Sequence, residues 1–377
     1  MKLNLALRSR RLANIKRQMK LLITGICGFV GSTLARALQE QCPRGESLQI
    51  FGVDNFSRPG SERNRLDLRA RGISIQHADL RVATDVDRLP QFDWVLDAAA
   101  NPSVLAGIDG KTSSREILDH NLYSTINLLE ACKRYKAGFI LLSTSRVYSI
   151  PGLVGLPMQV REGAFHLDST APLPRGVSAR GIQEQFSTES PVSLYGASKV
   201  ASELLALEYG ACFSLPIWIN RCGVLAGAGQ FGRPDQGIVS YWIHSWLRKR
   251  PLKYIGFGGT GHQSRDAFHP RDLVPLLQKQ IASVGSAPER VFNLGGGLDN
   301  TFSLLQLSSW CEQRFGRHEV AADHTPRSFD IPWMTMDFTK AREFWGWKPH
   351  TSLMALFEEL AQHAEANPNW LEISADR

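Results

Sequence analysis

The sequence predicts an α/β protein, built as a doubly wound parallel sheet with a smaller α/β subdomain towards the C-terminus. Three observations support this prediction. Short apolar runs alternate with stretches of helical periodicity between residues 20 and 221. The first apolar run enters a glycine-rich turn, and the second ends in an acidic residue, Asp54. The chain has 377 residues, which is enough for one or two domains with a large core.

The strands and helices of the first part follow one another in a regular order. Short apolar runs predict strands at 20–24, 48–53, 73–77, 93–99 and 138–143. Helical periodicity fills two of the intervals, at 32–40 and 113–135. The longer helix carries an apolar stripe of Leu118, Leu122, Ile126 and Leu129. Alternation of strands and helices predicts parallel pairing, because a crossover helix returns the chain to the same end of the sheet.

The second part begins with an irregular stretch. Between Tyr148 and Pro191 the sequence is rich in Pro, Gly and Ser, and it is too long for a simple loop. We expect this insert, 149–190, to pack over the active site or against a neighbouring subunit. Beyond it we expect helices at 195–210, 237–249, 302–315 and 352–366, a strand at 217–221, and a strand at 291–294 that returns to the main sheet.

The net charge of +7 is concentrated at the N-terminus. The first 20 residues carry seven of the 43 basic side chains and no acid, so the remainder has 36 basic and 36 acidic side chains. Nucleic-acid binding would need a basic face on the folded domain, and this distribution does not require one. The leader, 1–18, fits a mitochondrial-type presequence, a disordered basic tail, or an extension from an upstream start codon. We favour the extension, and we expect the leader to be disordered.

The six cysteines are scattered, without a Cys-x-x-Cys pair or a histidine at metal-binding spacing. This usage is typical of buried thiols in a reducing compartment, so we expect a cytoplasmic protein without a metal site. No apolar run is long enough to span a bilayer, and we expect no membrane partner.

A glycine-rich turn follows the first strand, with Gly25, Gly28 and Gly31 in the run Gly-Ile-Cys-Gly-Phe-Val-Gly. Glycines let the backbone approach a pyrophosphate, and the amides of the following helix attract its negative charge. Asp54 suits a ribose hydroxyl and favours NAD over NADP, since a carboxylate repels a 2′-phosphate. The nearby Arg58 and Arg63 weaken that preference.

Two later strand ends supply further candidates for the same ligand. Asp79 is expected either near the adenine or as the cap of the following helix. The small side chains at 98–100 suit close approach of a cofactor, although tight packing alone would also explain them.

Tyr195 and Lys199 stand four residues apart at the start of a predicted helix, which places both side chains on one face. A lysine ammonium beside a phenol favours the phenolate and lowers the tyrosine pKa. Such a tyrosine can remove a proton from a sugar hydroxyl near neutral pH. A lone Tyr-x-x-x-Lys match is weak, and it gains weight here from the phosphate-binding loop upstream.

With these features in place, the chain resembles the extended short-chain dehydrogenase/reductase family, in its nucleotide-sugar epimerase branch. The resemblance covers residues 19 to about 365. It is carried by the glycine loop, Asp54, Asp79, Ser143-Thr144 before Val147-Tyr148, the Tyr195/Lys199 pair, Arg265-Asp266 to Asp272, and Trp345 to Pro349.

The resemblance implies a division into a Rossmann-type NAD-binding domain at 19–221, containing the insert, and a mainly substrate-binding subdomain at 222–377. It also implies a homodimer or homotetramer, because the helices at 113–135 and 195–210 pair between subunits in this family. The implied cofactor is a tightly held NAD. The implied cofactor-binding residues are Gly25, Cys27, Gly28, Phe29, Val30, Gly31, Asp54, Asn55, Asp79, Leu80, Ala98, Ala99, Ala100, Tyr195 and Lys199.

The implied substrate is a nucleotide-diphosphate sugar. By resemblance, Thr144 hydrogen-bonds the reacting hydroxyl, Tyr195 takes its proton, and Lys199 holds the nicotinamide ribose. Arg265 and Arg327 are candidates for the diphosphate, with a surface ion pair to Asp330 as the alternative for Arg327. The implied substrate-binding residues are Asn101, Ser103, Thr144, Gln230, Asp235, Gln236, Arg265 and Arg327. Capping of their own loop is the alternative role for Asp235 and Gln236.

The residues after Thr144 help to choose among the reactions of the family. Dehydratases of the family place an Asp-Glu pair there, whereas this chain has Ser145 and Arg146. Arginine supplies neither acid nor base, so we expect epimerisation through a transient ketone, with hydride returned to the opposite face. We favour a 2-epimerase, and the nearest alternative is a 4-epimerase of the UDP-glucose type. A non-catalytic NAD-binding protein and an RNA-binding relative that uses the leader are weaker alternatives.

Overall fold

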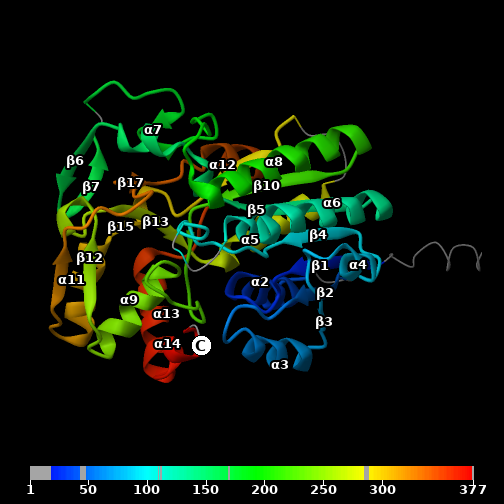
Figure 1. The fold of residues 1–377 in the computed structure, drawn as a ribbon, viewed down its shortest axis with the longest axis horizontal. Coiled ribbons are helices and arrows are strands. Elements are labelled where there is room, and N and C mark those ends of the chain that lie inside the picture. The colour runs from blue at the N-terminus through cyan, green and yellow to red at the C-terminus, as the bar shows by residue number, and fades with distance from the viewer. Residues whose placement is uncertain are drawn as a thin grey trace, which may run out of the picture.

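A seven-stranded parallel sheet forms the centre of the molecule (Figure 1). The computed structural model describes residues 18–42, 48–108, 110, 113–168, 170–283 and 288–375, so the predicted leader lies outside the described residues except for Gln18. The strand order is β14-β10-β5-β4-β1-β2-β3. Its strands are β1 Met19–Thr24, β2 Leu48–Asp54, β3 Ser74–His77, β4 Trp94–Asp97, β5 Gly138–Thr144, β10 Ile217–Cys222 and β14 Val291–Leu294. The predicted fold class is confirmed.

Helices cover both faces of this sheet, because alternate residues of each buried strand point to opposite sides. In β1, Leu21 and Ile23 pack into one hydrophobic core, and Leu22 packs into the other. The first core includes residues of α2 Phe29–Glu40, α3 Glu62–Ala70, α10 Val274–Ala282 and α12 Thr339–Trp345. The second includes residues of α4 Ala83–Asp87, α6 Ser124–Tyr135 and α8 Ser193–Phe213.

A smaller subdomain adjoins the carboxyl-end region of the sheet and has its own core (Figure 1). Trp242 and Leu360 are buried in that core, between helices and short strands. Its strands are β11 Val224–Leu225, β12 Leu252–Ile255, β13 Ser264–Phe268, β15 Thr301–Ser303, β16 Val320–Asp323 and β17 Trp333–Met334. Its helices are α9 Ile238–Leu247, α11 Leu304–Phe315, α13 Leu353–Ala366 and α14 Trp370–Ile373.

The insert packs against the smaller subdomain rather than over the active site, which corrects one of the two expectations for it. It contains α7 Ile150–Val154, β6 Met158–Arg161, β7 Ala164–Leu167, β8 Val177–Ser178 and β9 Gly181–Ile182. Phe165 N donates to His262 O at 2.9 Å, and Ile182 forms a bridge with Met336. Among the described residues of the insert, none lines the large cavity described below.

The single helix predicted at 113–135 is interrupted by one π-helical turn. Its parts are α5 Ser114–Leu118, the π-turn Asp119–Tyr123 and α6. The extra residue of the turn rotates the buried face, so that Leu128 and Leu129 are fully buried while Leu122 and Ile126 are only partly buried. The turn also buries Asn121, whose carboxamide accepts from Asn101 N at 2.9 Å and donates to Ser198 Oγ at 3.2 Å. It therefore ties the strand-end segment after β4 to helix α8.

The contact between α9 and α13 makes stability depend on pH. His363 Nδ1 lies 3.4 Å from His244 Nε2, and burial, reinforced by His363, Arg248 and Arg250, lowers the pKa of His244 to about 3. Between pH 6.5 and 3 the unfolded chain therefore binds more protons at this position than the folded chain does. The free energy of unfolding should fall on acidification through this window, by up to about 1.4 kcal/mol per pH unit for one group.

Urea unfolding at pH 7 and pH 5 measures this effect. The variant His244→Gln should lose part of the pH dependence, whereas His324→Gln, at an exposed position, should keep it. If the unfolding free energy falls by the same amount between pH 7 and pH 5 in the wild type and in both variants, the assignment to His244 is contradicted.

Candidate active site

A cavity of about 760 Å³ lies at the carboxyl edge of the main sheet and extends to the smaller subdomain. Its wall combines the glycine loop, the ends of β2, β4 and β5, the start of α8, and segments from the smaller subdomain. The carboxyl edge of a parallel sheet is where ligands bind in doubly wound folds. Most of the predicted site residues meet here, although they are spread from Gly25 to Arg327 in the sequence.

The glycine loop is as tight as the sequence pattern predicts. Gly25 has a φ of +57°, in the left-handed region that favours glycine. A Cβ atom on Gly31 would lie 2.3 Å from Gly25 O, so a side chain at position 31 would collide with the loop. Gly28 is the N-cap of α2, and no side chain caps that helix. The first amides of α2 are thus left to a ligand, and an anion is the ligand they attract.

Asp54 stands beside this loop at the end of β2. Its carboxylate accepts hydrogen bonds from Cys27 N and Phe56 N, both at 2.8 Å. Burial raises the pKa of Asp54, while the two backbone donors and the charge of His77 oppose the shift. The two amides hold the carboxylate at the cavity wall, where it can still accept from a ribose hydroxyl.

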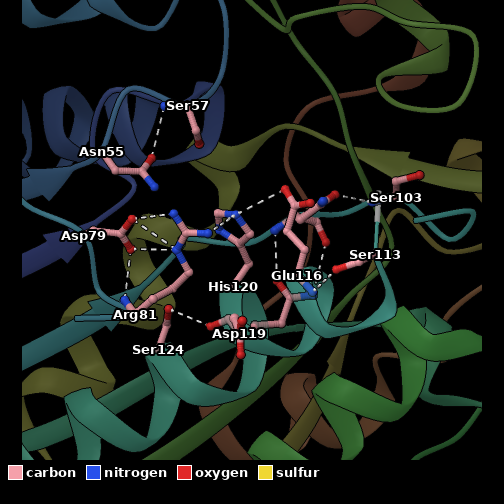
Figure 2. A network of polar contacts seen from close by, with 12 residues as sticks. Asn55, Ser57, Asp79, Arg81, Ser103, Ser113, Glu116, Asp119, His120 and Ser124 are labelled. Atoms are coloured by element: carbon pink, nitrogen blue, oxygen red, sulfur yellow. Dashed lines mark hydrogen bonds and ion pairs between the residues drawn. The ribbon is translucent and has the colours of Figure 1, made fainter. Parts of the chain in front are cut away.

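Asp79 forms an ion pair instead of capping a helix (Figure 2). Its carboxylate accepts from Arg81 Nη2 at 2.6 Å and from Arg81 Nε at 3.0 Å, and this bonding lowers the pKa of Asp79. Arg81 Nη1 in turn lies 3.2 Å from His120 Nε2. The following helix, α4, has Val82 at its N-cap and no side-chain cap, while Asp85 accepts from Asp79 N at 3.0 Å. Both Asp79 and His120 line the cavity.

Thr144 and Tyr195 both line the cavity. Thr144 ends β5, Tyr195 lies in the first turn of α8, and the two side chains lie close enough for Thr144 to act on the pKa of Tyr195. The close approach is possible because the next residue is Gly196, where a Cβ atom would lie 2.4 Å from Arg146 O. Burial raises the pKa of Tyr195, whereas the Thr144 side chain and the charge of Arg146 lower it.

Lys199, one turn after Tyr195 on α8, lies in a buried environment with carboxylates nearby. It is 1% exposed, and its Nζ atom points to Leu142 O at 3.5 Å. Burial lowers the pKa of Lys199, and the nearby carboxylates of Asp97 and Glu203 raise it. The charge of Arg146, on the turn after Thr144, also lowers the pKa of Tyr195. Helix α8 places Tyr195 and Lys199 on the same wall of the cavity. The carboxylates near Lys199 are those of Asp97, at the end of β4, and Glu203, on α8 itself.

Three arginines that line the cavity lie close to one another. Arg265 donates to Ile331 O at 2.8 Å and lies 3.7 Å from Asp330, and burial lowers its pKa to about 9. Arg146 donates to Phe329 O at 3.3 Å. Arg327 lies close enough to both for its charge to lower their pKa values. These groups form a basic cluster, Arg146, Arg265 and Arg327, with one carboxylate, Asp330.

The segment 230–237 joins the two parts of the molecule over the cavity. Ser103 Oγ donates to Asp235 Oδ2 at 2.9 Å, and Arg58 Nη1 donates to Gln236 Oε1 at 2.7 Å. These contacts join the segment to distant parts of the chain and do not cap its own loop, which was the alternative role expected for Asp235 and Gln236. Both residues line the cavity.

Three predicted ligand contacts lie behind the cavity lining. Cys27 is fully buried and takes part through its backbone N–H, as described above. Asn101 Oδ1 accepts from Ser103 N at 3.2 Å, and Ser103 holds Asp235. These residues shape the wall without forming it. Two residues outside the predicted site also line the cavity: Arg146, which supplies neither acid nor base, and Asp330, expected only as an alternative partner of Arg327.

The residues present fit NAD. The uncapped start of α2 suits a pyrophosphate, Asp54 suits a ribose, and the small side chains at 98–100 leave room at the end of β4. Among the described residues, no group of three or more His, Cys, Asp or Glu side chains is placed to hold a metal ion. No helix in the described part of the chain has the length and apolar character needed to cross a membrane.

The parallel sheet, the glycine loop and the Tyr195–Thr144 pair define an NAD-dependent enzyme of the Rossmann class. The model of the NAD dependent epimerase/dehydratase family matches residues 21–295. The CDP-paratose 2-epimerase of Salmonella typhi is 30% identical over 342 residues, covering 89% of this chain and 96% of that protein. The chain therefore belongs to the NAD dependent epimerase/dehydratase family.

Other relatives extend the comparison to a second reaction. UDP-glucuronate 4-epimerase 1 of Arabidopsis thaliana is 28% identical over 357 residues, covering 89% of this chain and 74% of that protein. The crystal structure of UDP-glucuronic acid 4-epimerase from Bacillus cereus, in complex with UDP-glucuronic acid and NAD, superposes with a TM-score of 0.75. It is 26% identical in sequence and covers 92% of this chain and 99% of its own. The relatives thus agree on epimerisation of a nucleotide sugar and differ in sugar, base and carbon.

Proposed function

We propose that this enzyme is a nucleotide-sugar 2-epimerase of the CDP-paratose/CDP-tyvelose type. The observation that carries epimerisation is the Tyr195–Thr144 pair, buried at the wall of a cavity whose glycine loop fits NAD. The 2-epimerase type is supported by the 30% identity over nearly the full length of one such enzyme. A UDP-glucose-type 4-epimerase remains the alternative, because the same residues would serve it with another carbon presented.

In the proposed reaction, Thr144 hydrogen-bonds the sugar hydroxyl and Tyr195 takes its proton. NAD bound on the glycine loop supplies the oxidation of that carbon and its reversal. Lys199, fixed between Asp97 and Glu203, holds the cofactor ribose. After the sugar has turned, Tyr195 returns its proton to the oxygen, so the residues end as they began. Ser145 and Arg146 supply no acid–base pair for loss of water, which argues against dehydration.

The charges around the cavity favour an uncharged sugar. The basic cluster brings three positive charges, and Asp330 brings one negative charge. The net charge of this group is therefore two positive charges, which would neutralise the two negative charges of a nucleotide diphosphate linkage. A hexuronate would add a third negative charge that this cluster alone does not balance, although Arg58 and Lys253 also line the cavity. The preference for a neutral sugar such as paratose over glucuronate therefore rests mainly on the 30% identity to a CDP-paratose 2-epimerase.

A substrate panel in deuterated water tests the proposal. CDP-, UDP-, GDP- and dTDP-sugars, with CDP-paratose and UDP-glucuronate among them, are incubated with the purified protein and followed by NMR. We expect inversion at carbon 2 of a neutral CDP-sugar without deuterium at the inverted carbon. Deuterium at that carbon would mean deprotonation of a C–H bond and would refute the mechanism. Inversion of UDP-glucuronate at carbon 4 would refute the substrate class.

We extend the proposal to the organisation of the chain. We place a division at residue 221 with β14 added to the NAD-binding domain, and helices α10 and α12 also pack into the core of that domain. Association into a homodimer or homotetramer through α6 and α8 is part of the same proposal. Equilibrium sedimentation tests it, and a monomer at micromolar concentration would contradict it.

A further inference from the structure

The segment 230–237 is supported by the C-terminal helix of the smaller subdomain. Phe231 stacks on Trp370 of α14, with the ring centroids 5.3 Å apart and an angle of 7° between the ring planes. Both rings are buried, and Trp370 Nε1 donates to Gln230 O at 2.8 Å. The start of the segment is therefore fixed to the smaller subdomain by an aromatic stack and a hydrogen bond.

The same segment meets the Rossmann part of the molecule at the start of α2. Phe231 and Trp370 pack with Phe29, the first residue of that helix. The loop after β2 is equally close, because a Cβ atom on Gly60 would lie 2.9 Å from the ring of Phe231. These contacts place the segment 230–237 beside the uncapped helix start that suits a pyrophosphate.

Arg58, in the loop after β2, adds polar bonds to this contact. Its Nη1 donates to Gln236 Oε1 at 2.7 Å, and its Nη2 donates to Phe231 O at 3.0 Å. The guanidinium also lies 5.9 Å from the centre of the Phe231 ring. A planar guanidinium can bond two acceptors at once in this way, so one side chain holds the segment 230–237 at two points.

Residues on both sides of this contact line the cavity. Asp54 and Arg58 line it from the Rossmann part, and Gln236 lines it from the segment 230–237. A cofactor seated on the glycine loop is therefore flanked by this segment. An enzyme that takes a hydride from a sugar and returns it must keep its cofactor through both steps, because loss of the reduced cofactor would leave the ketone behind.

We propose that Arg58 is a positioning residue that fastens the segment 230–237 to the loop after β2, and that this fastening retains NAD between turnovers. Arg58 acts through the segment, since its Nη1 and Nη2 atoms donate to Gln236 and to Phe231 O. The same contacts give this arginine a role that needs no 2′-phosphate, in keeping with NAD as the cofactor.

The rate of cofactor release measures this role without any sugar. The purified protein is loaded with radiolabelled NAD and chased with excess unlabelled NAD, and the bound label is followed by filtration. Arg58→Met keeps an apolar stem and removes both donors. Because hydrogen bonds from a charged donor are lost, we expect release to be at least about tenfold faster than in the wild type. The bond from Ser103 to Asp235 remains, so this variant should still bind NAD.

Two further variants separate the fastening from other roles of the guanidinium. Gln236→Leu removes one acceptor on the segment and leaves Arg58 in place, so it should accelerate release by a smaller factor. If the two residues act as one contact, the double variant should release NAD no faster than Arg58→Met alone. The matched control is Arg63→Met, which removes an exposed arginine that is not among the residues lining the cavity, and it should keep the wild-type rate.

The outcomes decide the role of Arg58 as follows. An unchanged release rate in Arg58→Met overturns the proposal. Accelerations that multiply in the double variant would mean that Arg58 and Gln236 contact NAD separately, which also overturns it. Equal acceleration in Arg63→Met would assign the effect to positive charge near the cofactor and remove the fastening. Should Arg58→Met fail to fold, an unchanged rate in Gln236→Leu overturns the proposal instead.

The release assay is independent of the proposed substrate. It contains NAD and no nucleotide sugar, so faster release in Arg58→Met would stand whichever sugar the enzyme epimerises. Conversely, epimerisation of the expected CDP-sugar together with an unchanged release rate would leave the proposed function intact and remove the role of Arg58.

Discussion

Replacing Tyr195 by phenylalanine is expected to lower kcat by about 10²- to 10⁴-fold, the range in which proton transfer by a positioned side chain contributes to catalysis. The ring of Tyr195 packs with Val104 and Ile117, and phenylalanine keeps these contacts. Only the hydroxyl is removed, together with its interaction with Thr144. NAD should remain bound, since the glycine loop and Asp54 are untouched. The measurements are kcat on the substrate identified by the panel and the amount of NAD released on denaturation.

A second tyrosine on the same helix supplies the matched control. Tyr209 donates to Glu130 Oε1 at 2.5 Å, away from the cavity. The variant Tyr209→Phe loses a hydroxyl and a hydrogen bond of similar kind, and it should keep kcat within about twofold of the wild type. Full activity in Tyr195→Phe would remove Tyr195 as the base. Loss of NAD in that variant would show that the hydroxyl serves the cofactor instead.

The pH dependence of the wild type follows from the same group. Burial raises the pKa of Tyr195, so the phenolate forms only at higher pH unless a cation opposes this. Because the phenolate is the active base, kcat should rise with pH and level off above the pKa of Tyr195.

The features predicted well from the sequence are those that depend on local patterns. Strands buried on both faces, such as the one containing Leu21 to Ile23, can be recognised in the sequence as short apolar runs. The glycine loop is recognisable because the collision at Gly31 involves atoms only six residues away, in Gly25. The position of Thr144 at a strand end and of Tyr195 in the first helical turn follows from the same local signals.

The features missed depend on contacts between distant segments. The π-turn at 119–123 leaves no distinct pattern, yet it decides that Asn121 is buried and which face of α6 meets the sheet. The pKa of Lys199 depends in part on Asp97, which lies 102 positions earlier and which no helical spacing indicates as a neighbour. The bond between Arg146 and Phe329 spans 183 positions. Charge neighbours of this kind arise from tertiary packing and became visible only in the folded chain.

The position of the insert, 149–190, could not be predicted from its composition. Its Pro- and Gly-rich composition correctly indicated irregular structure, but composition does not say which surface it covers. The β6–β7 hairpin meets the smaller subdomain because Ser264 Oγ and Ser303 Oγ donate to Phe165 O and Gly163 O. Those hydroxyls belong to strands more than 95 residues away, at separations of 99 and 140 positions.

Two glycines of the phosphate loop should respond differently to the same substitution. In Gly31→Ala, the new Cβ atom would lie 2.3 Å from Gly25 O and 2.8 Å from Ile26 Cα, so backbone must move. We expect the free energy of unfolding to fall by about 1–3 kcal/mol, the usual effect of overpacking, and NAD binding to be lost with the loop geometry. In Gly28→Ala, φ is −68° and the nearest atom is Gly25 O at 3.1 Å, so the fold should tolerate the methyl group.

The methyl group on residue 28 would nevertheless stand at the uncapped start of α2, where the pyrophosphate must approach the backbone. We therefore expect Gly28→Ala to weaken NAD binding at least tenfold while its unfolding free energy stays within about 1 kcal/mol of the wild type. Gly155→Ala is the control, because its Cβ atom would be equally crowded, 3.2 Å from Pro151 O, but lies away from the cavity lining. Urea unfolding of the cofactor-free protein and calorimetric NAD titration separate the two effects. Unchanged NAD affinity in Gly28→Ala would show that the pyrophosphate does not approach the backbone at residue 28.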